Sequence, residues 1–408
     1  MEGMKNRAAA TPVDDRSAFA VPDHVPDALI YDFDYLSTDI EYPVHDWWMQ
    51  LYAGPEIIWT PRNGGHWVFT RNHLISRAFD DIAHFSNEGM TIPREVRPFA
   101  LPPASADPPL HSDYRKLVQP FFSMKSIAEL EARARQLSIE LIEAVTPQGS
   151  CEFIHDLALK MPIGIFMSMV DLPDSDRDYL VQCADDMVRG TDDRGFVNAA
   201  AYLNRVFEER RRKPGRDMIS AIVQGTVEGG RPLNAEELTG MGVLLLAGGL
   251  DTVAAMMGFV ATHLAEHPEH RRLLRDRPDR MPRAIEELMR RYSLVNIGRM
   301  VVSDIIIGGV QLKAGDLVLL PTPLGGLDAQ QYQNPEQVDF DRKERHSLIF
   351  GRGPHMCLGQ FLARTELRVF FHEWLSRIPE FDIAPGARVT AVPGRVNFVR
   401  SLPLAWPI

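Results

Sequence analysis

Apolar residues recur every three to four positions over much of the chain, which is the period of a helix with one buried face. Between 71 and 84, for example, Leu74, Ile75, Ala78 and Phe79 fall on one face. The segments that share this pattern, and that we expect to be helices, are 71–84, 125–146, 153–170, 175–190, 195–212, 234–266, 267–292 and 358–377.

Strand patterns are fewer and shorter. Residues 299–322 contain β-branched and leucine-rich runs, with a turn at Gly308-Gly309, and residues 66–70 resemble one more short strand. Residues 89–112 contain six prolines, which forbid a continuous helix and indicate a long loop of the kind that is often functional. The pattern predicts a mainly α protein with small β-sheets, an α+β fold.

Composition indicates a globular chain with a large core, because 45% of the 408 residues are hydrophobic and 24% are charged. We see no internal repeat and no linker that would split the chain. We therefore predict a flexible N-terminal arm over 1–25 and a single domain over 26–408. The net charge of −11 argues against nucleic acid as a partner, because binding it depends on neutralising phosphates.

The cysteines and the apolar segments indicate a cytoplasmic protein. Cys151, Cys183 and Cys357 are an odd and sparse set, which argues against a disulfide framework or a structural zinc site. The N-terminus has no apolar core of signal-peptide length. Residues 241–265 are long and apolar enough to span a membrane, but Asp251 near the middle would be costly in lipid. We favour a buried helix and no membrane.

A capping box is expected where this helix begins. Asn234 is followed by Glu237 at the spacing that lets each side chain accept a hydrogen bond from the other residue's backbone.

The segment Phe-Gly-Arg-Gly-Pro-His-Met-Cys-Leu-Gly at 350–359 places Cys357 in a glycine-rich loop that leads into a helix. A helix N-terminus offers unpaired N–H groups and partial positive charge, and both favour a thiolate. Such a sulfur could be a catalytic nucleophile, a redox thiol or a metal ligand. The alternative is a buried cysteine after a tight turn.

A second unusual segment is Ala-Gly-Gly-Leu-Asp-Thr at 247–252. Two glycines inside an apolar helix cost about 1 kcal/mol each relative to alanine, which suggests a kink or a close approach. Asp251 beside Thr252 suggests proton handling in a dry site. The alternative is a crossing of helices at small residues, with Asp251 in a surface ion pair.

Both segments resemble signatures of one family. Phe350, Gly353, His355, Cys357 and Gly359 match the haem-binding signature of cytochromes P450, and 247–252 is similar to that family's Ala-Gly-x-x-Asp/Glu-Thr signature. The resemblance implies the cytochrome P450 fold, with haem b buried between the 234–266 helix and the cysteine loop with the helix that follows it.

The resemblance also assigns roles. Cys357 would be the axial ligand of the iron, its electron density favouring O–O cleavage. Asp251 and Thr252 would be catalytic and help to deliver protons, and Gly248 would make room for oxygen. Phe350 and Gly359 would belong to the cofactor-binding loop.

Further cofactor residues follow from the same family. His111, Arg115, Arg299 and His355 would bind the haem propionates, for which the bidentate fork of arginine is suited; for each of them taken singly, the alternative is a solvated surface role. Glu287, Arg290 and Arg342 resemble the family's structural triad, which we assign to folding and haem retention.

The chain further resembles bacterial class I members of the camphor 5-monooxygenase subfamily, in segments 85–86, 92–95, 107–109, 287–294 and 402–404. That similarity implies nine substrate contacts: Asn87, Met90, Phe99, Leu101, Leu244, Ala247, Val295, Ile297 and Val396. The tyrosine that would bind camphor's ketone is missing between Met90 and Ala104, and Ile297 replaces an aspartate. The resemblance thus implies a small apolar terpenoid other than camphor, such as a monoterpenoid or norisoprenoid.

The implied reaction is hydroxylation of a C–H bond with O2 and two electrons from NAD(P)H. The chain has no recognisable flavin or nicotinamide module, and three scattered cysteines do not make a four-thiolate iron–sulfur site. The family expectation is a [2Fe–2S] ferredoxin with its flavin-dependent reductase, docking on a basic patch for which Arg115, Arg345, Arg352 and Arg364 are candidates. Two alternatives are a peroxide-using haem-thiolate enzyme and a non-catalytic haem-binding sensor or carrier.

Overall fold

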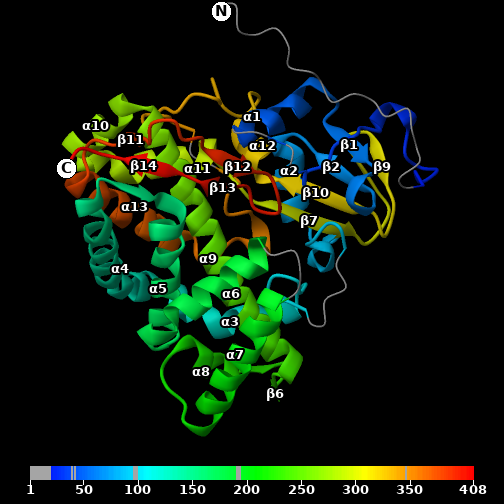
Figure 1. Ribbon diagram of the computed structural model, residues 1–408. Coiled ribbons are helices and arrows are strands. Elements are labelled where there is room, and N and C mark those ends of the chain that lie inside the picture. The colour runs from blue at the N-terminus through cyan, green and yellow to red at the C-terminus, as the bar shows by residue number, and fades with distance from the viewer. Residues whose placement is uncertain (1–19, 38–39, 41–42, 95–99, 190–193, 345–346) are drawn as a thin grey trace, which may run out of the picture. The chain divides into compact units, whose positions relative to one another are not determined.

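The computed structural model describes residues 20–37, 40, 43–94, 100–189, 194–344 and 347–408 (Figure 1). The chain divides into two compact units. Unit 1 comprises residues up to 96, 287–357 and 390–398, and unit 2 comprises 97–286, 358–389 and 399–408. The single domain over 26–408 and the N-terminal arm stay predictions, and residues 1–19 of that arm lie outside the described residues.

Unit 1 is built on a five-stranded sheet in the order β1-β2-β10-β7-β3, in which β10 pairs in parallel with β2 and the other pairs are antiparallel (Figure 1). The strands of this sheet are β1 (Ile57–Thr60), β2 (His66–Phe69), β3 (Phe85–Ser86), β7 (Asn296–Val301) and β10 (Leu317–Pro321). Unit 1 also contains β8 (Ile305–Ile307), β9 (Val310–Leu312) and β12 (Thr390–Val392), which belong to smaller sheets. The β pattern over 299–322 is therefore confirmed, although β7 begins slightly earlier.

Within the described residues, the α-helices that lie wholly in unit 1 are short. They are α1 (Val44–Met49), α2 (Asn72–Asp80) and α12 (Thr322–Leu327), and α2 is the one that reaches the cysteine loop. The Asp328 carboxylate accepts a hydrogen bond from the Asn72 N–H (2.8 Å), and Asn72 Nδ2 donates to Gly325 O (2.7 Å). These bonds satisfy hydrogen-bonding groups at the start of α2 and hold this helix beside α12. They thereby fix the direction of the last turn of α2.

Unit 2 is mostly helical. Its helices are α3 (Leu110–Val118), α4 (Met124–Val145), α5 (Lys160–Met169), α6 (Arg177–Arg189), α7 (Arg194–Arg212), α8 (Met218–Gln224), α9 (Ala235–Glu266), α10 (Pro268–Asp276) and α13 (Gln360–Arg377). Its strands are β4 (Ser150–Glu152), β5 (Thr226–Val227), β6 (Arg231–Pro232), β11 (Asp382–Ile383) and β14 (Pro403–Ala405). Two elements, α11 (Met281–Arg291) and β13 (Phe398–Ser401), contribute residues to both units.

Helix α9 begins with the predicted capping box. Asn234 Oδ1 accepts from the Glu237 N–H (2.9 Å), and Glu237 Oε2 accepts from the Asn234 N–H (2.7 Å). Tyr114 on α3 also donates to Glu237 Oε1 (2.6 Å), which ties α3 to the start of α9. The helix is long and apolar enough to cross a membrane, but 65% of its most apolar stretch is buried within the protein, as expected of an internal helix.

Two of the predicted helices are interrupted. The segment 267–292 is α10, a 3-10 turn (Pro278–Arg280) and α11, because Pro278 cannot donate the bond that would continue α10. The segment 153–170 is a π-helical turn (Ile154–Ala158) followed by α5. Pro162 in the first turn of α5 has no N–H with which to continue the ladder back to Ala158.

Candidate active site

The cysteine loop of unit 1 is a series of tight turns that ends with an accessible sulfur. The Cys357 N–H donates to Phe350 O (2.9 Å), and the Met356 N–H donates to Gly353 O (3.1 Å). His355 is half-buried and ends the short turn η10 (Gly353–His355). Cys357 is exposed, which contradicts the alternative of a buried cysteine.

The glycines of this loop are needed because it lies against the last turn of α2. Gly351 and Gly353 both have positive φ (65° and 66°), which side chains disfavour. A Cβ on Gly353 would lie 2.7 Å from the Phe79 carbonyl oxygen, and one on Gly351 would lie 3.6 Å from the Phe79 ring. Arg352 adds an ion pair with Asp80 (3.2 Å).

Arg299, predicted to bind a propionate, lies on β7 and is only 2% exposed. Its guanidinium carbon lies 5.2 Å from the centre of the Phe79 ring, and its Nη1 donates to Gly298 O (2.8 Å). A solvated surface role is therefore wrong for Arg299. Phe79 contacts both Arg299 and the cysteine loop, yet the sequence marks it only as one more apolar position in a helical period.

The Glu287 carboxylate is the centre of the predicted structural triad. Arg290 donates to both of its oxygens (2.7 and 2.8 Å), and Arg342 Nε lies 2.9 and 3.1 Å from them. Both arginines also donate to Gln337 O. The three side chains are at most 8% exposed, so removing one would strand a buried charge.

Five predicted substrate contacts belong to unit 1, and they gather around β7. Val295 and Val396 form a β-bridge, and Ile297 follows on β7. Met90 O accepts from the Gly298 N–H (2.9 Å), and Asn87 is 2% exposed at the start of η4 (Asn87–Gly89). Predicted substrate contacts that are far apart in the sequence thus lie close to β7.

In unit 2, the middle of α9 has an exposed face. Most of this helix is buried, but Leu244, Ala247 and Thr252 are half-buried, and Gly248 and Gly249 are exposed. A Cβ on either glycine would meet nothing within 4 Å. The glycines therefore leave open space beside the helix, which is a surface that a flat apolar group can cover.

The proposed catalytic pair lies at this face. The Thr252 hydroxyl donates to Gly248 O (3.2 Å), one turn earlier, and is half-buried. Asp251 is 6% exposed, so the alternative of an exposed carboxylate on the protein surface is wrong. A buried carboxyl beside an accessible hydroxyl is an arrangement suited to proton transfer.

Helix α3 carries His111 and Arg115 one turn apart, the first buried and the second half-buried. Burial, followed by the positive charge of Arg115, lowers the pKa of His111, so its ring is neutral at pH 7. Leu101 is buried in the segment before α3, where a Cβ on Gly240 of α9 would meet Ala100 O at 2.0 Å. Phe99, the remaining predicted contact, lies outside the described residues.

The residues fit haem b on three counts. Of the three cysteines only Cys357 is exposed, whereas burial raises the pKa of Cys151 to about 12 and also that of Cys183, so both remain thiols. Unit 1 supplies Arg299 and His355 as donors for carboxylates. Unit 2 supplies His111 and Arg115 together with the open apolar face of α9.

Comparisons with known proteins decide the family. A family model described as cytochrome P450 matches residues 169–390, which is more than half of the chain. The chain is a cytochrome P450. It is 33% identical to the probable cytochrome P450 127A1 of Sinorhizobium fredii, over 95% of this chain and 97% of that protein.

Two crystal structures place this cytochrome P450 beside the bacterial class I group. The chain is 37% identical to CYP101J2 (TM-score 0.88) and 38% identical to CYP101C1 (TM-score 0.89), in each case over 95% of this chain and all of the other. The predicted P450 fold is thus confirmed. So are the predicted activity, a haem-thiolate monooxygenase, and the cofactor, haem b.

The arginines predicted to form a docking patch for a ferredoxin have different environments. Arg352 is exposed and paired with Asp80, and Arg115 is half-buried on α3. Arg364 on α13 forms an ion pair with Glu286 and donates to Gln360 O (3.0 Å), so its charge is already engaged. Arg345 lies outside the part of the chain that the structure describes.

Proposed function

We propose that this cytochrome P450 hydroxylates a small, mostly hydrocarbon terpenoid, such as a cineole-like monoterpenoid or an ionone-like norisoprenoid. The observation that carries the proposal is the chemistry of the expected contacts. Around β7 they include Val295, Ile297 and Val396, and on α9 they are Leu244 and Ala247. None of these five offers a hydrogen-bonding side chain, so shape and apolar contact would contribute most to substrate selection.

The similarity to CYP101 proteins supports a small substrate, and the differences within the chain argue against camphor. With Ile297 on β7, this position cannot hold a polar partner for a ketone. Losing one polar anchor costs about 1–3 kcal/mol of binding energy. Asn87 is the one predicted contact with an amide, and it is buried. It is the residue that we would expect to meet an ether or ketone oxygen.

The residues that we assign to the cofactor are those that the family resemblance implies. When bound, haem supplies the activation of O2 and the transfer of one oxygen atom to a C–H bond. We assign the thiolate of Cys357 to the iron, and Phe350 and Gly359 to the loop that presents it. His111, Arg115, Arg299 and His355 would hold the propionates by charge-assisted hydrogen bonds.

Proton supply is assigned to α9. The Thr252 hydroxyl would hold a proton donor at the open face of the helix, and the buried carboxyl of Asp251 would resupply it. Gly248 would keep that face clear of side-chain atoms, since its Cβ position borders open space. These groups position protons and exclude bulk water.

Electrons would come from a [2Fe–2S] ferredoxin reduced by a flavin-dependent reductase, in the cytoplasm. The support is the likeness to the class I group. The test is reconstitution. NADH use and hydroxylated product should appear only with both partner proteins. Equal product formation from peroxide alone would favour a peroxide-using enzyme, and no turnover with any ferredoxin would favour a sensor.

The substrate class is tested by a spectral screen of the ferric protein. Monoterpenoid ethers and norisoprenoid ketones should shift the iron from low to high spin, whereas polar compounds of similar size should not. Leu244→Ala should change the order of preference among the compounds that bind. Leu246→Ala is the matched control, because Leu246 is fully buried two positions along the same helix; it should leave that order unchanged. A screen in which no small terpenoid shifts the spin state contradicts the proposal.

A further inference from the structure

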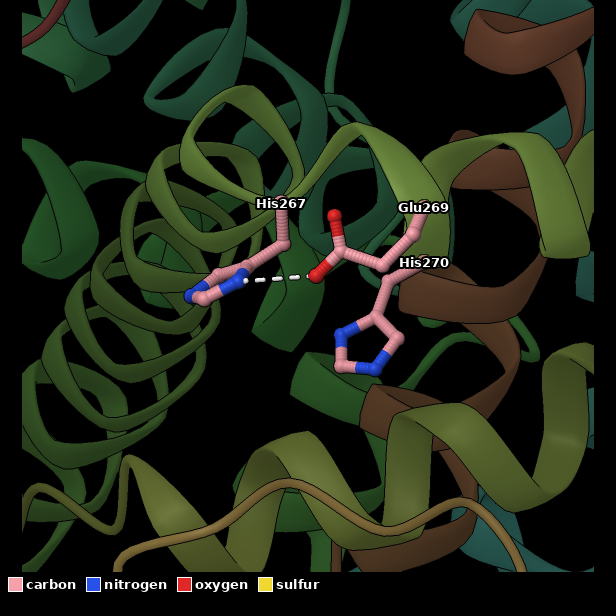
Figure 2. A group of neighbouring side chains, drawn as sticks. All are labelled: His267, Glu269 and His270. Atoms are coloured by element: carbon pink, nitrogen blue, oxygen red, sulfur yellow. Dashed lines mark hydrogen bonds and ion pairs between the residues drawn. The ribbon is translucent and has the colours of Figure 1, made fainter.

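His267, Glu269 and His270 lie together where α9 ends and α10 begins in unit 2 (Figure 2), and His263 is a fourth side chain of this region. His263 lies in the last turn of α9, His267 joins the two helices, and Glu269 and His270 lie in the first turn of α10. None of these side chains belongs to the predicted haem or substrate contacts. We call them the 263–270 cluster.

The donor atoms of His267, Glu269 and His270 lie close together, and His263 contacts His270. His263 Nε2 lies 2.9 Å from His270 Nδ1, and His267 Nδ1 lies 3.2 Å from Glu269 Oε1. Each of His267, Glu269 and His270 offers one ligand atom, and these atoms lie within 4.8 Å of one another. Figure 2 shows the His267 and Glu269 side chains turned toward one another, with the His270 ring beside them.

The backbone produces this convergence. His263 and His267 are four positions apart and thus on one helical face. Pro268 begins α10 directly after His267, whose non-helical φ and ψ (−124° and 76°) turn the chain between the helices. The turn brings His270 back over His263, with ring centres 5.1 Å apart and nearly parallel. The cluster is therefore built into the joint between two helices.

We propose that His263, His267, His270 and Glu269 bind a transition-metal ion, with Zn²⁺ as the best match. Zinc binds imidazole and carboxylate groups, and its structural sites have four ligands in tetrahedral geometry. Zinc–nitrogen bonds of about 2.0–2.1 Å would separate neighbouring donors by about 3.3 Å. The two measured contacts, 2.9 and 3.2 Å, are within a few tenths of an ångström of that spacing.

The neighbouring arginines leave Glu269 available to a cation. The two that follow His270 are directed at Glu380: Arg271 Nη2 lies 2.8 Å and Arg272 Nε 3.7 Å from its carboxylate oxygens. Both arginines thus pair with Glu380 rather than with Glu269, which can serve as a carboxylate ligand.

Such a site would be structural. Four protein ligands close a tetrahedral zinc ion to substrate, and here they would fasten the last turn of α9 to the first turn of α10. A metal ion that binds only the folded chain raises the free energy of unfolding by mass action. The competing account is that His263 and His270 share only a hydrogen bond, and that His267 and Glu269 form an ordinary surface pair.

The test uses the full-length haem-loaded protein without an affinity tag, stripped with a chelator and then dialysed against ZnCl2. We expect about one zinc per chain by elemental analysis, an unchanged iron content, and a higher melting temperature with zinc than without it. Glu269→Gln and His267→Ala should each weaken zinc binding at least about tenfold. Glu269 is exposed and His267 half-buried, so the variants should fold.

The matched control is His73→Ala. His73 Nε2 lies 3.6 Å from Glu56 Oε2 on an exposed surface, so it is a histidine–glutamate pair outside the 263–270 cluster. This variant should bind zinc as the natural chain does. Zinc retention no greater than that of the stripped chain would overturn the proposal. So would equal retention by Glu269→Gln and His267→Ala.

Discussion

At the scale of the residue, we propose that Thr252 serves proton delivery and not substrate binding. Its hydroxyl donates to Gly248 O on the open face of α9. We expect Thr252→Ala to bind substrate normally, as judged by the spin-state shift. It should, however, form about tenfold less product per NADH, with the electrons recovered as hydrogen peroxide. The measurement is peroxide and product yield in the reconstituted system.

Thr262→Ala is the control for this prediction. Thr262 lies on the same helix and makes the same bond to a carbonyl one turn earlier, Gly258 O at 2.8 Å, but is 1% exposed. It should keep the natural product yield. If Thr252→Ala couples NADH to product as well as Thr262→Ala does, Thr252 has no part in proton delivery.

Glu366 on α13 is a second residue with a measurable consequence. Burial raises the pKa of Glu366 to about 8, and within the described chain no hydrogen-bond partner reaches its Oε2. The folded state therefore keeps a proton that the unfolded state, with an ordinary pKa of 4.5, releases. Stability should fall as pH rises from about 4.5 to about 8, by an amount on the order of a few kcal/mol.

Glu366→Gln removes this dependence because the amide stays neutral. Chemical denaturation at a series of pH values should show the variant gaining stability over the natural chain as pH rises through that window. Glu373→Gln is the contrast, since Glu373 is a buried carboxylate paired with Arg377 (2.6 Å), and its loss should destabilise the chain at pH 7. Parallel pH profiles for Glu366→Gln and the natural chain would refute the assignment.

At the scale of the element, the cysteine loop depends on the position of α2. Gly353→Ala would place a Cβ 2.7 Å from Phe79 O and strain a positive φ. We expect a loss of about 1–2 kcal/mol from φ alone, a further loss from the clash, and poor haem retention. Gly309→Ala has a similar φ (78°) but open surroundings, so it should lose stability and keep its haem. Equal haem content in the two variants would contradict this account.

Elements were predicted best where one apolar period continues without interruption. The segment 125–146 became α4 (Met124–Val145), and the capping box of α9 formed as expected. The single helix over 267–292 was wrong because Pro278 breaks it, and a hydrophobic period alone does not reveal a missing backbone donor. The ends of helices therefore depend on backbone hydrogen bonds as well as on the apolar period.

At the scale of the whole molecule, the sequence indicates which residues are candidates for the site, but it does not indicate which of them come into contact. The β-bridge between Val295 and Val396 joins positions that only the family resemblance connected. Phe79, which contacts Arg299 and the cysteine loop, has no signal beyond its helical period. Likewise, the 263–270 cluster depends on the turn between α9 and α10, which periodicity does not describe. Such contacts are products of tertiary packing.

The central claim is that Cys357, and no other side chain, is the protein ligand of the haem iron. The most direct measurement is the absorption spectrum of the reduced protein with carbon monoxide. We predict the long-wavelength band typical of cysteine thiolate ligation, lost in Cys357→Ser and kept in Cys151→Ser and Cys183→Ser, whose thiols are buried. A band of the shorter-wavelength type in the intact protein, or a thiolate band that survives in Cys357→Ser, would contradict the account.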